Sequence, residues 1–223
     1  MIERILRASG VILFAIVGGD QASASELFAP VIDSFTAFCS GRCAVTVFAG
    51  PQLKTDLAAV LGVEGIFTPP WRYKWGNSQF LGASLSRDLY QWQNYFKVEV
   101  EAGLGKRFGA FHETDGWGAI YFRWTDFPWN DRIKTSVAVS TGLDLASAVP
   151  YWEAHETGVP GGSKLMHYFS PELTFAIPER PGWEMVLRVH HRSGGRQYWG
   201  NAAIFHGTGG GIQYGVVGLR HHF

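Results

Sequence analysis

The stretch Trp183–Gly195, with the sequence WEMVLRVHHRSGG, decides the fold of this chain. In an extended strand, successive side chains point to opposite sides. One side carries Trp183, Met185, Leu187, Val189, His191 and Ser193, and the other carries Glu184, Val186, Arg188, His190 and Arg192. An apolar side opposite a charged side over about ten residues is typical of a transmembrane β-barrel strand, with lipid outside and a polar lumen inside. His191 and Ser193 end the apolar side with an imidazole and a hydroxyl, about 7 Å apart along the backbone.

The same alternation recurs along the chain and predicts eight strands. In the range 95–107, Phe96, Val98 and Val100 alternate with acidic and basic residues, which a polar lumen explains. The expected strands are 43–50, 78–87, 95–107, 116–125, 133–146, 164–177, 183–195 and 211–223. Short turns are expected at 126–132 and 178–182, and longer connections at 106–115, 148–163 and 194–210. This asymmetry predicts an eight-stranded antiparallel transmembrane β-barrel of the outer membrane over residues 43–223. A secreted β-sandwich is the alternative that also alternates.

Composition and the N-terminal residues support export. The chain has 223 residues with no net charge, which gives no indication of nucleic-acid binding, and 15% of its residues are aromatic. Residues 1–24 are expected to be a signal peptide, with Arg4 and Arg7 before an apolar run and cleavage after Ala24. An N-terminal membrane anchor is the alternative, although about a dozen apolar residues are too few for it. Residues 25–42 are then a periplasmic lead-in.

The two cysteines, Cys39 and Cys43, are the only ones in the chain. In an oxidising compartment, this spacing predicts a disulfide that closes a small loop. A redox centre is an alternative. A metal site is not expected, because two cysteines without a neighbouring histidine supply too few ligands.

The turn near residue 180 sets which residues should lie opposite each other on neighbouring strands. Pairing about this turn places Ser193 opposite His167, and pairing about the connection near residue 202 places His191 beside Gln213. All four side chains should face outward at the outer-leaflet end of the barrel. Polar groups that face hydrocarbon cost free energy unless they are partnered, and they are often functional. The alternative is that they lie in the interfacial belt, where polar residues are ordinary.

An exported eight-stranded barrel with His-x-Ser on the outward side of a late strand resembles the PagL-type lipid A 3-O-deacylases, an acyloxyacyl hydrolase type of outer-membrane barrel. The resemblance implies that His191 is the base and Ser193 the nucleophile of an ester hydrolase. Lipid A, or lipopolysaccharide of the outer leaflet, is the implied substrate and no cofactor is implied. Backbone amides of Gly194 and Gly195 could bind the oxyanion, since glycine permits close approach of a substrate.

Two positions depart from that family. Gly194 stands where the family has Asn, and no Asp or Glu follows Glu184, although the family has an orienting acid about a dozen residues after the serine. An acid could come from Glu153 or Glu156, Asn201 could orient the base, or His167 could itself be the base. An inactive relative is a further alternative.

A non-enzymatic small barrel is the competing class of function, with a structural, adhesion or lipopolysaccharide-binding role. A general porin is disfavoured, because side chains fill an eight-stranded lumen. The chain ends on Phe223 after an amphipathic strand, which resembles the signal read by the outer-membrane assembly machinery. That machinery is an expected partner, and a homodimer is left open.

Overall fold

The computed structural model describes residues 37–65, 67–151, 153, 162–194, 204–208 and 210–223. The expected signal peptide 1–24 and residues 25–36 of the lead-in lie outside these ranges. The barrel is the compact unit Cys43–Phe223.

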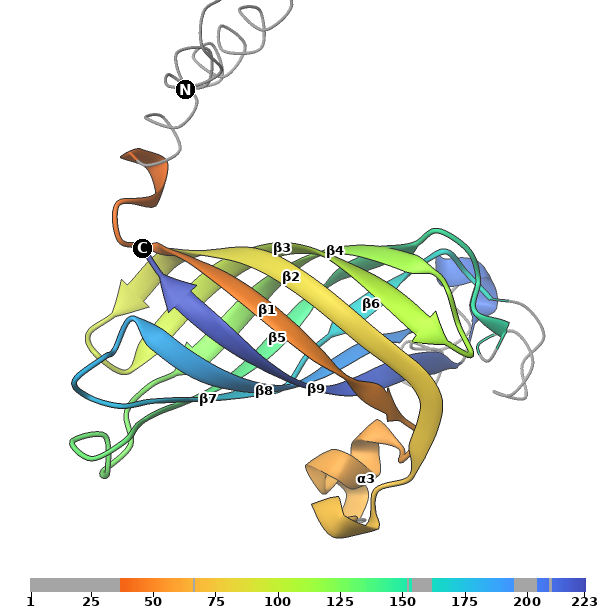
Figure 1. Cartoon of the computed structure of the whole chain (residues 1–223), viewed down its shortest axis with the longest axis horizontal. Helices are drawn as coiled ribbons and strands as arrows, with labels where there is room; N and C mark the ends of the chain where they lie inside the picture. Colours follow the sequence, from red (N-terminus) through yellow and green to blue (C-terminus); the bar gives the residue numbers. More distant parts are fainter. Residues whose placement is uncertain (1–36, 66, 152, 154–161, 195–203, 209) are drawn as a thin grey trace, which may run out of the picture. The chain divides into compact units, whose positions relative to one another are not determined.

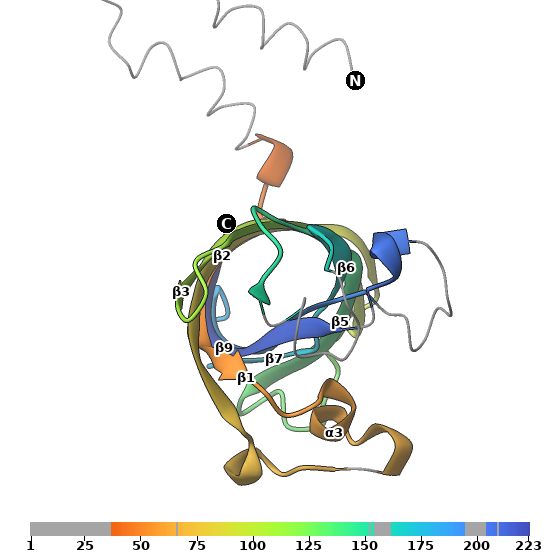
Figure 2. The ribbon, with the colours of Figure 1, turned by 90° about the vertical axis from the view of Figure 1, so that its right-hand side faces the viewer.

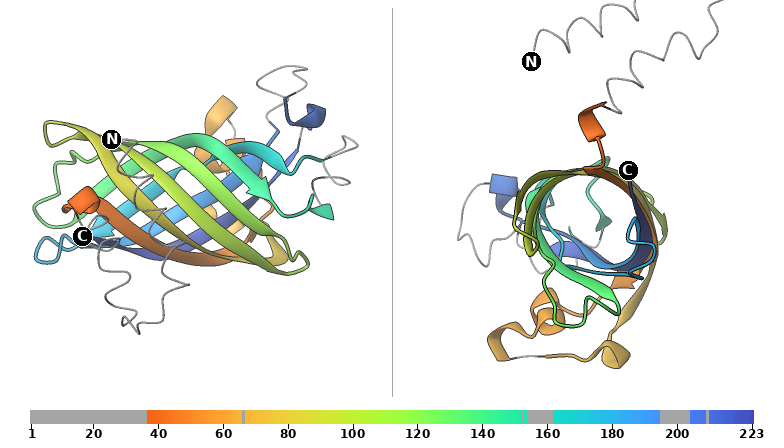
Figure 3. Two further views of the ribbon diagram at one scale, coloured as in Figure 1. Left: turned by 90° about the horizontal axis from the view of Figure 1, so that it is seen from above. Right: turned by 90° about the vertical axis from the view of Figure 1, so that its left-hand side faces the viewer.

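Nine antiparallel strands form a closed ring with eight positions (Figures 1 and 2). They are β1 (Cys43–Leu53), β2 (Trp75–Trp92), β3 (Phe96–Gly109), β4 (Thr114–Trp124), β5 (Lys134–Ala146), β6 (Leu165–Phe169), β7 (Glu172–Ala176), β8 (Trp183–Ser193) and β9 (Gly211–His222). Consecutive strands pair around the ring, β9 pairs with β1, and both β6 and β7 lie between β5 and β8. The ring therefore has eight positions, which confirms the predicted eight-stranded barrel. Figure 3 shows it from the side and along its axis.

The expected strand 164–177 is divided into β6 and β7 at Ser170 and Pro171. Proline has no backbone N–H to donate to a neighbouring strand, so it interrupts the regular pattern. Backbone contact continues across the break, because the Ser140 N–H donates to the Ser170 carbonyl at 3.1 Å and the Val189 N–H donates to the Pro171 carbonyl at 3.0 Å. The break changes the hydrogen-bond pattern without opening the wall.

Side chains divide between the two faces of the wall as the alternation predicts. On β3, Val100 is 39% exposed, whereas Glu99 and Glu101 are 5% and 1% exposed. On β8, Trp183 and Met185 are exposed and Arg188, His190 and Arg192 are buried. The outward surface is thus mainly apolar and the charged side chains fill the lumen, the arrangement of a barrel that spans a membrane.

The lumen is filled in three layers. At the terminal end, where β1 begins and β9 ends, the Glu172 carboxylate accepts hydrogen bonds from Arg123 at 2.7 Å, Arg188 at 2.8 Å and Arg220 at 2.8 Å. An aromatic layer follows, made of Phe48, Phe80, Trp117, Tyr121, Tyr168, His190 and Tyr214. At the opposite, loop end lies a second charged layer of Arg107, Asp115, Asp144, Glu153 and Arg192.

Connections differ between the two ends. At the terminal end they are residues 93–95, 125–133 and 177–182, and at the loop end 54–74, 110–113, 147–164 and 194–210. The expected long connection 106–115 is wrong, because β3 and β4 extend toward each other and leave four residues between them. The segment 54–74 carries the short helices α3 (Leu57–Leu61), η1 (Val63–Gly65) and η2 (Pro70–Arg72). None of the helices in the described ranges is long and apolar enough to cross a membrane.

Both cysteines are disulfide-bonded. Because the chain has only Cys39 and Cys43, the predicted disulfide between them is confirmed.

Candidate functional site

The outward end of β8 brings together the polar residues that the sequence singled out. His167 on β6 lies opposite Ser193, and Gln213 on β9 lies opposite His191, as the turn positions predict. His167, His191 and Ser193 are half-buried, and Gln213 is 7% exposed. The register thus places two imidazoles, a hydroxyl and an amide on adjoining outward positions of three strands.

His191 is held in one orientation by Gln213. The two side chains are joined by a hydrogen bond of 2.9 Å between His191 Nδ1 and Gln213 Oε1. The amide oxygen only accepts hydrogen bonds, so Nδ1 of the imidazole carries the proton. The other side of the amide fixes which atom is the oxygen, because Gln213 Nε2 donates to the Thr55 carbonyl. A neutral His191 therefore has an unprotonated Nε2, the form that a general base requires.

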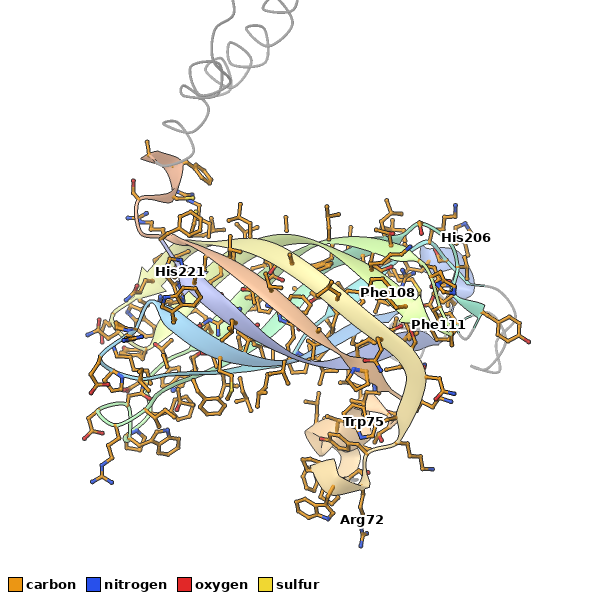
Figure 4. The ribbon with its side chains drawn as sticks, viewed as in Figure 1. Arg72, Trp75, Phe108, Phe111, His206 and His221 are labelled. Atoms are coloured by element: carbon orange, nitrogen blue, oxygen red, sulfur yellow. The ribbon has the colours of Figure 1, made fainter. Side chains whose placement is uncertain are left out.

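The segment that follows β1 positions the Gln213 side chain, because Gln213 Nε2 donates a hydrogen bond to the Thr55 carbonyl in this segment. Figure 4 shows Arg72 and Trp75 of this segment beside the barrel near its loop end, far from His221 at the terminal end. The Trp75 indole lies over the outward face of Gly215, where an added Cβ would be 3.1 Å from the ring. Leu53 and Gln213, both outward residues, are buried beneath this segment at 3% and 7% exposure. We call residues 54–75 the docked segment.

Asp56 of the docked segment is a site residue that the sequence reasoning missed. Its carboxylate accepts a hydrogen bond from the Ala58 N–H at 2.8 Å and so caps α3, and it also acts electrostatically on the His191 imidazole. Asp before a short Leu-Ala-Ala run is a recognisable helix cap in the sequence. Nothing in that signal indicates an electrostatic effect on β8, because the effect depends on the fold of a segment far away in the chain.

Ser193 and His167 complete the outward patch. In the described part of the chain, no hydrogen bond joins the Ser193 hydroxyl to His191. His167 Nε2 and Thr141 Oγ1 are 2.9 Å apart, so this imidazole is also positioned by a hydrogen bond. Catalytic hydrogen bonds are often long before substrate binds, so the geometry is compatible with a serine that is activated on binding.

Other residues predicted for this site lie elsewhere. Glu153 is fully buried in the lumen, where its carboxylate lies 3.0 Å from Arg192 Nε. It is therefore on the opposite side of the wall from His191 and does not orient the imidazole. Burial raises the pKa of Glu153 from its ordinary value of 4.5 to about 7.

The predicted oxyanion donor at Gly194 is also wrong, because its N–H donates to the Gly210 carbonyl at 3.0 Å. Gly194 is instead required by packing, since an added Cβ would lie 1.8 Å from the Thr208 carbonyl oxygen. Glu156, Gly195 and Asn201 lie outside the described residues.

The arrangement places an imidazole of defined tautomer, His191, and a hydroxyl, Ser193, on the outward side of β8. Gln213 holds the imidazole through Nδ1. A group of metal-ligand type occurs in the lumen, made of Asp115, Asp144 and His190.

Comparison with known proteins is limited to the fold. No protein-family model matches this chain, and no curated protein matches it. Among solved structures, the outer membrane enzyme PagL is similar at 17% identity, over 80% of this chain and 98% of that chain, with a TM-score of 0.48. Neisserial surface protein A is similar at 10% identity, over 82% of this chain and 97% of that chain, with a TM-score of 0.49. OprG from Pseudomonas aeruginosa is similar at 10% identity, over 82% and 96%, with a TM-score of 0.37.

The chain's own features are those of a small outer-membrane β-barrel: a closed ring, an apolar outward surface, a filled polar lumen and short turns at one end. In barrels of this kind the longer loops face the cell exterior. The outward patch lies at the loop end of this one.

Proposed function

We propose that this chain is an outer-membrane ester hydrolase that removes an ester-linked acyl chain from lipid A. His191 is the general base and Ser193 is the nucleophile. The observation that carries the proposal is the Gln213 amide, which holds His191 with an unprotonated Nε2 on the outward face.

The position of the patch favours a lipid substrate. A base and a hydroxyl on the outward face at the loop end meet the outer leaflet, and lipid A presents its acyl esters there. Polar groups at this depth cost free energy unless they are partnered, and those that occur there are often functional. An enzyme acting on a substrate from the lumen would instead need an open interior, whereas charged and aromatic side chains fill this one.

The proposed reaction follows from the roles of the two residues. As Ser193 Oγ attacks the ester carbonyl, His191 Nε2 takes its proton, and a tetrahedral intermediate forms. His191 then gives that proton to the leaving sugar oxygen, and an acyl-serine remains. Water, activated by His191, hydrolyses the acyl-serine and releases the fatty acid. The Gln213 oxygen stabilises the imidazolium that forms in each step, because the oxygen accepts the Nδ1–H.

Mass spectrometry of lipid A tests this proposal. The chain is expressed with its residues 1–24, proposed to direct export, in cells whose lipid A carries a full set of acyl chains. We expect lipid A to lose the mass of one hydroxyacyl chain with the wild type and to stay intact with Ser193→Ala and His191→Asn. His221→Asn is the matched control, because it removes an imidazole at the terminal end, and it should act as the wild type does.

Folding is checked in each variant by the change in gel mobility that heating gives to folded barrels. If the folded wild type leaves lipid A unchanged, the enzyme proposal fails and a non-enzymatic barrel takes its place. If Ser193→Ala keeps full activity, the assignment of the nucleophile is wrong.

A further inference from the structure

Three buried side chains converge where the aromatic layer meets the loop-end layer of the lumen: Asp115, Asp144 and His190. One carboxylate oxygen of each aspartate and one ring nitrogen of His190 all lie within 4.8 Å of one another. The three residues are 0%, 0% and 1% exposed. Among the described residues, Oδ1 of Asp115, Oδ2 of Asp144 and Nε2 of His190 have no hydrogen-bond partner. Buried polar atoms nearly always have a hydrogen-bond partner, so three unsatisfied atoms in one group of side chains require an explanation.

Each of the three side chains is positioned by its other polar atom. Arg107 donates to Oδ2 of Asp115, and Arg192 donates to Oδ1 of Asp144 at 2.8 Å. This is the arrangement of metal sites, where outer partners fix the carboxylates and imidazoles that bind the ion.

The protonation of His190 follows from a chain of hydrogen bonds. The Tyr121 hydroxyl donates to the Glu101 carboxylate at 3.3 Å, so its oxygen is left to accept from the Tyr168 hydroxyl, also 3.3 Å away. Because a hydroxyl has one proton, the Tyr168 oxygen then accepts from Nδ1 of His190, 3.2 Å away. Nε2 of a neutral His190 is therefore unprotonated.

An unprotonated nitrogen then lies near carboxylate oxygens of Asp115 and Asp144, and these electron-rich atoms repel one another. The Arg192 Nη1 atom is 3.9 Å from Asp115 Oδ1, which is beyond hydrogen-bond distance. His190 Nε2 and Asp144 Oδ2 are 3.9 Å apart. Two metal–ligand bonds of about 2.1 Å span up to about 4.2 Å, so the separation suits ions of the size of Zn²⁺.

The net charge of the loop-end layer also favours a bound cation. Glu113, Asp115, Asp144 and Glu153 are its acids, and Arg107 and Arg192 are its bases. With all of these ionised, the described residues of the layer carry two more negative than positive charges, which a divalent cation would balance.

We propose that Asp115, Asp144 and His190 bind a divalent first-row transition metal ion such as Zn²⁺ inside the barrel, where it links β4, β5 and β8. Two carboxylates and an imidazole suit such ions, whose fourth position is then left to water. The site lies on the opposite side of the wall from His191 and Ser193 and does not depend on their role. It departs from the sequence-based expectation that the chain holds no metal, which considered only residues close in sequence.

The test uses the refolded barrel, freed of metal by chelator and then titrated with Zn²⁺. Elemental analysis after washing should give one zinc ion per chain, and Co²⁺ should give the weak visible absorption of nitrogen and oxygen ligands. Loss of an outer partner alone weakens metal sites about 10–100-fold. Losing a ligand, as in Asp144→Asn or His190→Gln, should therefore weaken binding by about 100-fold or more.

Two matched controls distinguish this site from accidental binding. Asp88→Asn and His221→Gln remove the same groups elsewhere and should bind zinc as the wild type does. The proposal would be overturned if the folded wild type bound no zinc, or if His221→Gln lost as much zinc affinity as the ligand variants. A water molecule or a second proton on the His190 imidazole would then account for the unsatisfied atoms. If Asp144→Asn does not fold, His190→Gln and the wild-type titration still decide.

Discussion

Replacing Gln213 tests how much the orientation of the proposed base, His191, contributes to activity, because the proposed nucleophile Ser193 is left unchanged. Gln213→Leu keeps the size of the side chain but removes the acceptor for His191 Nδ1–H and the donor to the Thr55 carbonyl. A neutral hydrogen bond contributes about 1 kcal/mol, so losing the first should let the imidazole adopt its other tautomer and cost about 5-fold in kcat/KM. Losing the second should loosen the docked segment without a large further loss of activity.

Gln213→Glu distinguishes these two contributions. A carboxylate still accepts from His191, but it cannot donate to Thr55 and instead repels that carbonyl oxygen. We expect this variant to keep activity within about 3-fold, because the base remains oriented. The docked segment should loosen, and trypsin should cleave faster after its exposed residues Arg72 and Lys74.

The assay is release of fatty acid from purified lipid A by the refolded barrel, with limited trypsin digestion of the same samples. The reasoning fails if Gln213→Leu is as active as the wild type, because His191 would then need no orienting group. It also fails if Leu and Glu at this position lose activity equally, because the acceptor would then be irrelevant.

Three further predictions concern the lumen. Glu172→Gln should lower the free energy of unfolding by about 3–5 kcal/mol in urea titration. The substitution replaces a carboxylate that three buried guanidinium groups share by a neutral amide. In the control Glu179→Gln, the glutamate is exposed, so the free energy of unfolding should change by less than about 0.5 kcal/mol. Gly105→Ala should cost about 1–3 kcal/mol in the same titration, because its Cβ would lie 2.1 Å from the Phe80 ring. Burial raises the pKa of Glu153 from 4.5 to about 7, so the folded barrel binds that proton more tightly than the unfolded chain does. In chelator, the free energy of unfolding should therefore fall by up to about 3 kcal/mol as the pH rises from about 4.5 to about 7. Glu153→Gln should reduce this dependence without removing it, because Asp115 and Asp144 are buried carboxyl groups of the same layer; an unchanged pH profile would contradict it.

Alternation and turn position were enough to predict the wall of the barrel and its outward patch. A strand's two faces are fixed by a period of two, and a turn of known centre fixes the register. The pairs His167 with Ser193 and His191 with Gln213 follow from these two facts alone. The division of β6 from β7 was harder to foresee, because Pro171 ends regular pairing while the wall continues on both sides.

Residues outside the strands could not be placed in this way. Glu153 belongs to a connection with no period, so the sequence could not show that its carboxylate turns inward to Arg192. Thr55 contributes through its backbone carbonyl, a group that every residue has, so the residue type could not indicate this role. The lumen group around His190 joins three strands across the interior, and neighbours across a lumen depend on tilt and side-chain length rather than on pairing.

The hydrogen bond from Gln213 to Thr55 crosses the line where β1 and β9 meet, between residues 158 positions apart in the chain. Contacts of such long range form late in folding, because the intervening chain must be organised first. The first and last strands must therefore meet before the amide that orients His191 is held. A barrel that is still open lacks an oriented base, so the protein should acquire its chemistry only when the ring closes.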